Sequence, residues 1–288
     1  LVGNTGQISL GHAGFVAIGA YTTVLLMKAG LPLIAGLLAA ALAAAFFGAV
    51  LGIPSLKLEG PYLAIATLGF GLAVTVIIGR VEMFGGRMGL SVPRPNLNWT
   101  GLSYDRSLFY LIILVTVVLT ICTRSIIKSR IGRAFQAIRD SDIAAAAAGV
   151  NVAYFKTLSF AVSAAYAGIA GGFMALYLSF INPTLFTFVQ SIIFLAMIIL
   201  GGLGSVAGSI LGAVVLTFLN LQLENILEVP VIGPALASFS EQYMSIGGIS
   251  NISWVFTGLI LILIILFEPL GLYGLWLRVK WYWKTWPF

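Results

Sequence analysis

Three polar side chains lie close together near the start of the chain, in the stretch GQISLGHAGFVAIGAY at residues 6–21. They are Gln7, Ser9 and His12, and His12 is the single histidine of the sequence. An amide, a hydroxyl and a neutral imidazole can each donate and accept hydrogen bonds. Beside an apolar run, such groups either line a path for a polar solute or hold neighbouring helices together. On a helix, Ser9 and His12 would be i, i+3 neighbours on one face, whereas nearby glycines predict a non-helical start at Gln7.

Two other polar side chains lie inside apolar runs and allow the same two interpretations. Thr67 would either bond its own helix backbone or face the path. Gln190 lies in the middle of a predicted span, where its amide needs a partner. We predict Gln7, Ser9, His12, Thr67 and Gln190 as candidates for a substrate route. Packing is the favoured interpretation for His12, and the route is favoured for Gln190.

The composition places these side chains in a membrane protein. Of 288 residues, 60% are hydrophobic and 8% are charged, against roughly 25% charged in a typical soluble domain. A soluble core cannot bury so large an apolar fraction, so lipid must surround much of the chain. The apolar runs are continuous rather than alternating, which favours helices over a barrel. The predicted fold is therefore all-α, a polytopic transmembrane helix bundle.

Apolar runs of about 20 residues predict about eight spans in a single transmembrane domain that covers residues 1–288. The spans are 9–27, 32–53, 61–79, 108–127, 157–180, 185–202, 205–226 and 251–267. Small residues recur at helical spacing in Gly48 and Gly52, in Gly168 and Gly172, and in Gly204, Gly208 and Gly212. Such ridges allow close helix packing in lipid. Packing within one subunit is the favoured interpretation, and dimerisation is the alternative.

Basic residues predict which side of the membrane each loop faces. They gather in the 124–156 loop and in the C-terminal tail, whereas the 227–250 loop holds two glutamates and no Lys or Arg. The positive-inside rule puts the first two in the cytoplasm and the third outside. The number of spans between these loops agrees with that assignment. It also puts the 80–107 loop outside, although this loop carries four arginines.

The sequence patterns of many enzymes and pumps are missing. No GxxxxGK[ST] phosphate-binding loop occurs, and His12 and Cys122 alone cannot make a tetrahedral metal site. No span holds a carboxylate pair at helical spacing, which argues against a proton-relay pump. The net charge of +6 lies in the loops, so it indicates membrane orientation rather than nucleic-acid binding. We therefore expect a conduit that is not an enzyme, with no catalytic residue, metal or cofactor of its own and no nucleic-acid partner.

The basic loop at about 128–156 predicts a short helix between two spans. Ser141, followed by Asp142, can open a helix, and alanines at 144–148 continue it. Gly149 ends it as the residue after the C-cap. A short helix on the cytoplasmic face that ends in glycine can dock into a groove on another protein.

The order of residues in this loop resembles the coupling loop of ABC importer permeases. The matching residues are Gly132, Arg133, Ala137, Ile138, Arg139, Asp140, Ala144, Ala145, Gly149, Lys156 and Phe160. GQISLGHAGFVAIGAY, GPYLAIATLGFG at 60–71 and EPLGLYGLWLRVKWYWKTWPF at 268–288 resemble further motifs of one such family. Over nearly its whole length, the chain resembles the branched-chain amino acid ABC transporter permease family (LivM type).

The resemblance implies the permease subunit of an ATP-driven ABC importer for leucine, isoleucine and valine, working by alternating access in the bacterial inner membrane. The implied partners are a second permease subunit, in a homo- or heterodimer, two cytoplasmic ABC ATPase subunits that bind the ATP, and a periplasmic substrate-binding protein. Arg133, Arg139, Asp140 and Gly149 would lie at the ATPase contact. The C-terminus would be cytoplasmic, and membrane lipid would surround the bundle.

The chain departs from the family pattern at three places. The alanine run at 144–148 lacks the polar residue that the family often has there. Phe84 precedes Gly85 and Gly86 where the family usually has a threonine. The family's first helix lies upstream of the GQxSLGH motif, so we expect an N-terminal helix to be missing before Leu1. Three alternatives stay open: an ABC permease for urea, amides or other amino acids; an ATP-independent secondary carrier; and a passive channel.

Overall fold

The structure is a computed structural model that describes residues 1–58, 60–95, 101, 103–227, 258–259, 262, 266 and 271–285. The chain divides into two compact units, residues 1–192 and 193–288, and each is described by itself. Among the described residues, five helices are long and apolar enough to cross a membrane. They are Leu33–Gly52, Pro61–Arg80, Tyr104–Lys128, Val152–Leu178 and Pro183–Gly201.

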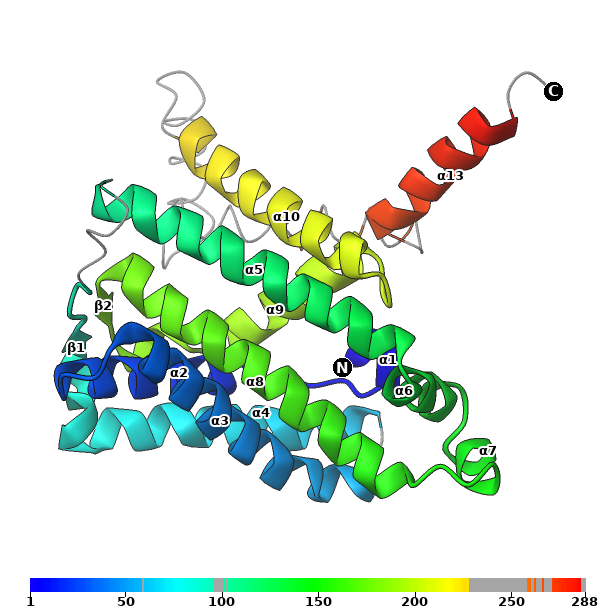
Figure 1. Cartoon of the computed structure of the whole chain (residues 1–288), viewed down its shortest axis with the longest axis horizontal. Helices are drawn as coiled ribbons and strands as arrows, with labels where there is room; N and C mark the ends of the chain where they lie inside the picture. The colour runs from blue at the N-terminus through cyan, green and yellow to red at the C-terminus, as the bar shows by residue number, and fades with distance from the viewer. Residues whose placement is uncertain are drawn as a thin grey trace, which may run out of the picture. The chain divides into compact units, whose positions relative to one another are not determined.

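The described part of the first unit consists mainly of helices (Figure 1). Its helices are α1 (Val2–Thr5), α2 (His12–Lys28), α3 (Leu33–Gly52), α4 (Pro61–Arg80), α5 (Tyr104–Lys128), α6 (Arg130–Asp140), α7 (Asp142–Ala147), α8 (Val152–Leu178) and the start of α9 (Phe188–Gly201). Short 3-10 turns lie at Pro54–Leu56, Glu82–Phe84, Gly86–Met88 and Pro183–Leu185. Two short strands, β1 (Leu90–Ser91) and β2 (Phe180–Ile181), pair antiparallel.

Helices α2, α3 and α8 form the core of this unit, and glycines let their backbones approach closely. A Cβ added at Gly48 on α3 would lie 2.8 Å from the carbonyl oxygen of Phe160 on α8, and one at Gly168 would lie 2.6 Å from that of Ala40. A Cβ at Gly19 would collide with the backbone of Gly168. In lipid, where apolar surfaces gain little by leaving the solvent, such close packing holds helices together.

The two predicted GxxxG pairs therefore pack inside the chain, which is the interpretation that the sequence favoured. Gly48 and Gly52 face α8, Gly168 faces α3, and Gly172 faces α2 and α3. Around them, Phe15, Ala44 and Ala164 form a fully buried apolar cluster.

An aromatic group lies near the strands at one end of the first unit. Tyr21 on α2 meets Phe84 edge-on at a ring separation of 5.7 Å, and Phe186 at 6.1 Å. Phe84, at the position where the resemblance implies a threonine, is thus a packing partner of the buried Tyr21.

The second unit contains the end of α9, α10 (Val206–Leu227) and α13 (Gly271–Thr285). Gly208 and Gly212 on α10 pack against the backbone of α9 at Gly201. The predicted ridge of three glycines is wrong at Gly204, which lies in the turn between the helices with φ of +84°. A left-handed φ suits a glycine in a turn rather than in a helix.

Seven of the eight predicted spans coincide with helices, although several ends differ; the eighth, 251–267, falls largely outside the described residues. The helix of the first predicted span, α2, begins at His12 rather than at residue 9, and residues 6–11 are not helical. α5 and α8 begin at 104 and 152 instead of 108 and 157, and they have 25 and 27 residues. At about 1.5 Å per residue, both helices are longer than the roughly 30 Å hydrocarbon core requires. The count of eight spans and the single domain over 1–288 stay predictions.

Candidate functional site

The 6–11 segment, which joins α1 to α2, is held by polar side chains from other elements. The backbone N–H of Leu10 donates to the hydroxyl of Thr67 on α4 over 2.9 Å. The N–H of Ala13, in the first turn of α2, donates to Ser191 Oγ on α9, also over 2.9 Å. The first N–H groups of a helix have no partner within the helix, so Ser191 supplies one. The start of α2 is therefore fixed by α4 and α9.

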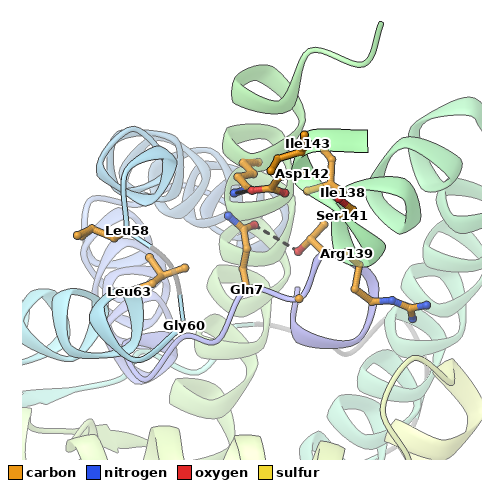
Figure 2. A pocket seen from close by; sticks show the side chains of 12 residues that line it. Gln7, Leu58, Gly60, Leu63, Ile138, Arg139, Ser141, Asp142 and Ile143 are labelled. Atoms are coloured by element: carbon orange, nitrogen blue, oxygen red, sulfur yellow. Dashed lines mark hydrogen bonds and ion pairs between the residues drawn. The ribbon is translucent and has the colours of Figure 1, made fainter. Parts of the chain in front are cut away.

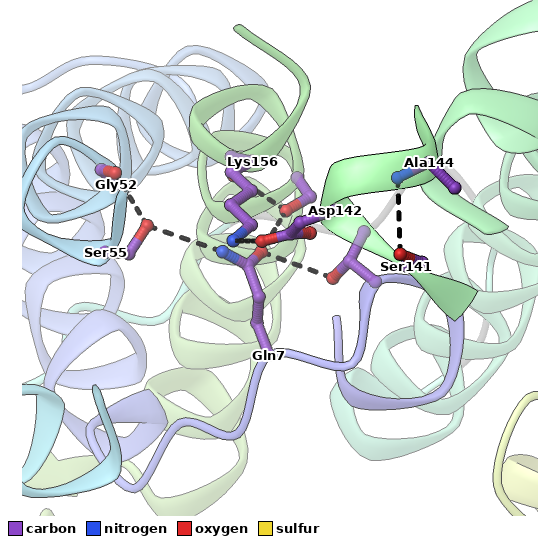
Figure 3. Close-up of polar contacts among 9 residues, drawn as sticks. Gln7, Gly52, Ser55, Ser141, Asp142, Ala144 and Lys156 are labelled. Atoms are coloured by element: carbon purple, nitrogen blue, oxygen red, sulfur yellow. Dashed lines mark hydrogen bonds and ion pairs between the residues drawn. The ribbon is translucent and has the colours of Figure 1, made fainter. Parts of the chain in front are cut away.

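Gln7 is buried within this segment and bridges several elements (Figure 3). Its Oε1 accepts from Ser159 Oγ on α8 at 2.7 Å and from Thr5 Oγ1 at 3.3 Å. Its Nε2 donates to Ser55 Oγ at 3.4 Å. Only 5% of Gln7 is exposed, and its amide makes hydrogen bonds through both ends. The predicted non-helical start at Gln7 is confirmed.

His12 is the first residue of α2, and both of its ring nitrogens meet a serine. Nδ1 lies 3.0 Å from Ser9 Oγ, and Nε2 lies 2.7 Å from Ser163 Oγ on α8. The expected proximity of Ser9 and His12 is present, but Ser9 precedes the helix instead of belonging to it, because α2 begins after Gly11. Phe15 packs edge-on against the imidazole at 5.8 Å. His12 thus ties the start of α2 to α8.

Thr67 is fully buried on α4 and makes two hydrogen bonds. Its hydroxyl donates to the carbonyl oxygen of Ala64 over 2.9 Å and accepts from Leu10 N. The hydrogen bond to Ala64, in its own helix, is one of the two roles that the sequence allowed for Thr67. The hydrogen bond from Leu10 was not predicted. The backbone at Gly11 passes close to that of Thr67, because a Cβ at Gly11 would collide with the Thr67 carbonyl oxygen.

Gln190 lies apart from these four residues in its contacts. It occupies the first turn of α9, inside the segment Pro183–Gly201, which is long and apolar enough to cross a membrane. Within that segment, Pro183–Leu185 forms a separate 3-10 turn and the α-helix begins at Phe188. Its amide makes no hydrogen bond to another described residue. Its assignment to a route stays a prediction.

The 128–156 loop contains two helices rather than the one predicted. The missed helix, α6, buries Ala134, Phe135 and Ile138 on one face and exposes its charged residues on the other. Its mixed composition hides it from a search for apolar runs, although the spacing of these apolar residues at three and four is the signal of an amphipathic helix.

The predicted ends of the second helix, α7, are confirmed. The Ser141 hydroxyl accepts from Ala144 N, which caps the start. At the other end, Gly149 N donates to Ala146 O and Val150 N to Ala145 O, both over 3.0 Å. With Gly149 at φ of +85°, this is a Schellman motif.

The residues of this loop that are predicted to contact an ATPase are accessible at its surface. Arg133, Arg139, Asp140 and Gly149 are all exposed. Arg139 donates to the Gly3 carbonyl over 3.0 Å and pairs with the neighbouring Asp140 at 3.1 Å. Arg139 therefore also ties α6 to the N-terminal residues.

A cavity of about 350 Å³ brings the two predicted groups of residues together (Figure 2). Its lining includes Gln7 from the first group, Arg139 from the second, and Asp142 and Lys156. Lys156, on the first turns of α8, is 5% exposed and forms an ion pair with Asp142 on α7. Sequence reasoning noted Lys156 only as part of a motif. The sequence signal for this ion pair is a lysine near the start of an apolar helix and an acidic residue in the preceding short helix.

Taken together, these features define a polytopic helical membrane protein in which a polar cluster around Gln7 lies next to a short capped helix between two long ones. The chain belongs to the family described as branched-chain amino acid transport system / permease component, whose model matches residues 1–267.

Curated relatives agree with this family. The high-affinity branched-chain amino acid transport system permease protein LivM of Escherichia coli (strain K12) is 39% identical over 242 residues, which are 75% of this chain and 57% of that protein. The protein of that name in Salmonella typhimurium is 38% identical over 242 residues. A probable branched-chain amino acid transport permease protein LivM of Methanocaldococcus jannaschii is 25% identical over 232 residues. The chain spans less than two thirds of the length of these relatives, and no solved structure matches it significantly.

Proposed function

We propose that the chain is the permease subunit of an ATP-driven ABC importer for leucine, isoleucine and valine in the bacterial inner membrane. The observation that carries this proposal is the family match over residues 1–267. The names of the relatives, which describe branched-chain amino acid transport, agree with it. The complex would contain a second permease subunit, two cytoplasmic ABC ATPase subunits and a periplasmic substrate-binding protein.

In this proposal α7 is the element that the ATPase contacts. The helix is fixed at both ends by its caps, and Ile143 on it is 84% exposed. An exposed isoleucine on a small, capped helix suits insertion into an apolar groove. Arg133 and Arg139 on the neighbouring α6 would add charge at the rim, where it governs the rate and specificity of association more than the affinity.

The substrate route would pass beside the 6–11 segment in the first unit. This segment is irregular backbone between helices, which a membrane protein tolerates where protein or a water-filled path surrounds it. Gln7, Ser9, His12 and Thr67 would then form the polar wall near the cytoplasmic end, with the C-terminus on the same side of the membrane. Transport would follow from ATP-driven exchange between inward-open and outward-open states.

The proposal is tested by reconstituting the complex in proteoliposomes. The chain is co-purified with candidate ATPase and second permease subunits from the same organism, and uptake of radiolabelled leucine is measured with a binding protein present. We expect uptake only with ATP, and none when the phosphate-binding lysine of the ATPase is replaced. Uptake without ATP would favour a secondary carrier or a channel. Competition by urea or simple amides, without competition by isoleucine and valine, would overturn the substrate class.

A further inference from the structure

Three polar side chains on α8 form one stripe, and each contacts a different element. Lys156, Ser159 and Ser163 are spaced i, i+3 and i+7, which places them within a sector of about 60° on the helix. Lys156 pairs with Asp142 on α7, Ser159 contacts Gln7, and Ser163 contacts His12. One face of α8 therefore contacts α7, Gln7 in the 6–11 segment and His12 at the start of α2.

The ion pair between Asp142 and Lys156 connects α7 to the bundle. The Lys156 side chain is 7% exposed and that of Asp142 is 30% exposed. α7 has six residues, and Ala145 is its one buried side chain. So short a helix is unstable alone, so its position depends on its caps and on tertiary contacts. Movement of α7 must therefore either move Lys156 or break a largely buried ion pair, which is costly.

The next contact along the stripe has two alternative forms. Ser159 Oγ lies 2.7 Å from Gln7 Oε1 and 2.7 Å from the carbonyl oxygen of Lys156. A hydroxyl carries one proton, so a full hydrogen bond to one acceptor weakens the bond to the other. Ser159 can hold Gln7, or release it and bond its own helix. Figure 3 shows Gln7 next to the Asp142–Lys156 pair.

We infer that Lys156 and Ser159 are positioning residues of the transport cycle, through which the position of α7 controls the position of Gln7. When an ATPase displaces α7, the ion pair carries the displacement to the start of α8. Ser159 then exchanges Gln7 Oε1 for the Lys156 carbonyl, and Gln7 loses its hydrogen bond to α8. This inference rests on the proposed function, because it takes α7 to be the element that the ATPase moves.

The test separates coupling from folding by removing both charges at once. Removing one partner leaves the other charge without this ion pair, whereas neutralising both is nearly neutral for stability. In the double variant Asp142→Asn with Lys156→Met, we expect wild-type thermal stability and ATPase co-purification. Leucine taken up per ATP hydrolysed should fall about fivefold or more, the low end of typical coupling between two sites. Ser159→Ala should lower the same ratio with the ion pair intact.

Matched controls use charges outside the 128–156 loop. Asp105→Asn and Arg106→Gln replace exposed residues in the first turn of α5, and both should keep the wild-type ratio. A double variant that folds and keeps the wild-type ratio would overturn the inference. So would Ser159→Ala with wild-type coupling.

A second readout does not depend on leucine. Leu58 lines the cavity beside Gln7, so Leu58→Cys is introduced after Cys122→Ala. The rate at which a maleimide labels this cysteine should change when ATP binds the complex. This change should vanish in the double variant. If leucine is not transported but the labelling response still requires Lys156, the substrate class fails and the positioning role stands. An unchanged response in the double variant, or no response to ATP in the parent complex, would contradict the positioning role.

Discussion

His12 on α2 and Ser163 on α8 are 151 residues apart in sequence, and His12 Nε2 lies 2.7 Å from the Ser163 hydroxyl. With Nδ1 at 3.0 Å from Ser9, the imidazole is used at both ends. Such a bond between helices is worth about 0.6–2 kcal/mol in a membrane.

We therefore expect His12→Ala to lower the free energy of unfolding by about that amount. His12→Gln should restore part of the loss, because an amide can replace one of the hydrogen bonds. Thermal stability in detergent measures these losses. In a double-mutant cycle with Ser163→Ala, the two losses should be non-additive because the two residues share one hydrogen bond. Leucine uptake per folded transporter tests the other role. If His12→Ala leaves stability unchanged and lowers uptake, the route interpretation replaces packing.

Local signals in the sequence were sufficient for some of this site. The cap at Ser141, the left-handed glycine at 149 and the proximity of Ser9 to His12 each involve residues within a few positions of one another. Such features follow from backbone geometry alone. The two GxxxG pairs were also predictable as packing surfaces, because small residues at helical spacing have few other uses in lipid.

The contacts that assemble the site were not predictable in this way. Gln7 and Ser159 are 152 residues apart, and Leu10 and Thr67 are 57 apart. Their meeting depends on how α4 and α8 pack against α2, which no local pattern specifies. Helix α6 was missed because hydropathy identifies apolar runs and this helix has a polar face.

The close approach of α3 to α8 predicts a large cost for one added methyl group. In Gly48→Ala, the new Cβ would lie 2.5 Å from Ala164 Cβ and 2.8 Å from the Phe160 carbonyl oxygen. Overpacking of this kind costs about 1–3 kcal/mol. Gly69→Ala on α4 is the matched control, because nothing lies within 4 Å of its added Cβ. It should gain up to about 1 kcal/mol from helix propensity. Equal thermal stabilities of the two variants in detergent would contradict the observed packing.

The left-handed backbone at Gly149 predicts a defect confined to the loop. Gly149 is exposed, has φ of +85° and has open space around its Cβ position, so a substitution acts through the backbone rather than through a clash. Gly149→Val should cost about 1–2 kcal/mol locally and distort the end of α7. Membrane insertion should stay normal while ATPase co-purification and leucine uptake fall. Gly149→Asn, which tolerates the left-handed region, should retain most of both. Normal co-purification and uptake in the valine variant would exclude this role for α7.

The last prediction concerns the sides of the membrane. Met88 and Ile143 are 87% and 84% exposed, and the charge pattern places Met88 outside and Ile143 in the cytoplasm. Single cysteines at these positions, made after Cys122→Ala, should react with a membrane-impermeant maleimide from opposite sides of right-side-out and inverted vesicles. Between them the chain contains α5, whose 25 residues can cross the bilayer once. A single crossing requires opposite labelling. If both cysteines react from the same side, α5 does not cross the bilayer alone, and α7 loses its assigned access to a cytoplasmic ATPase.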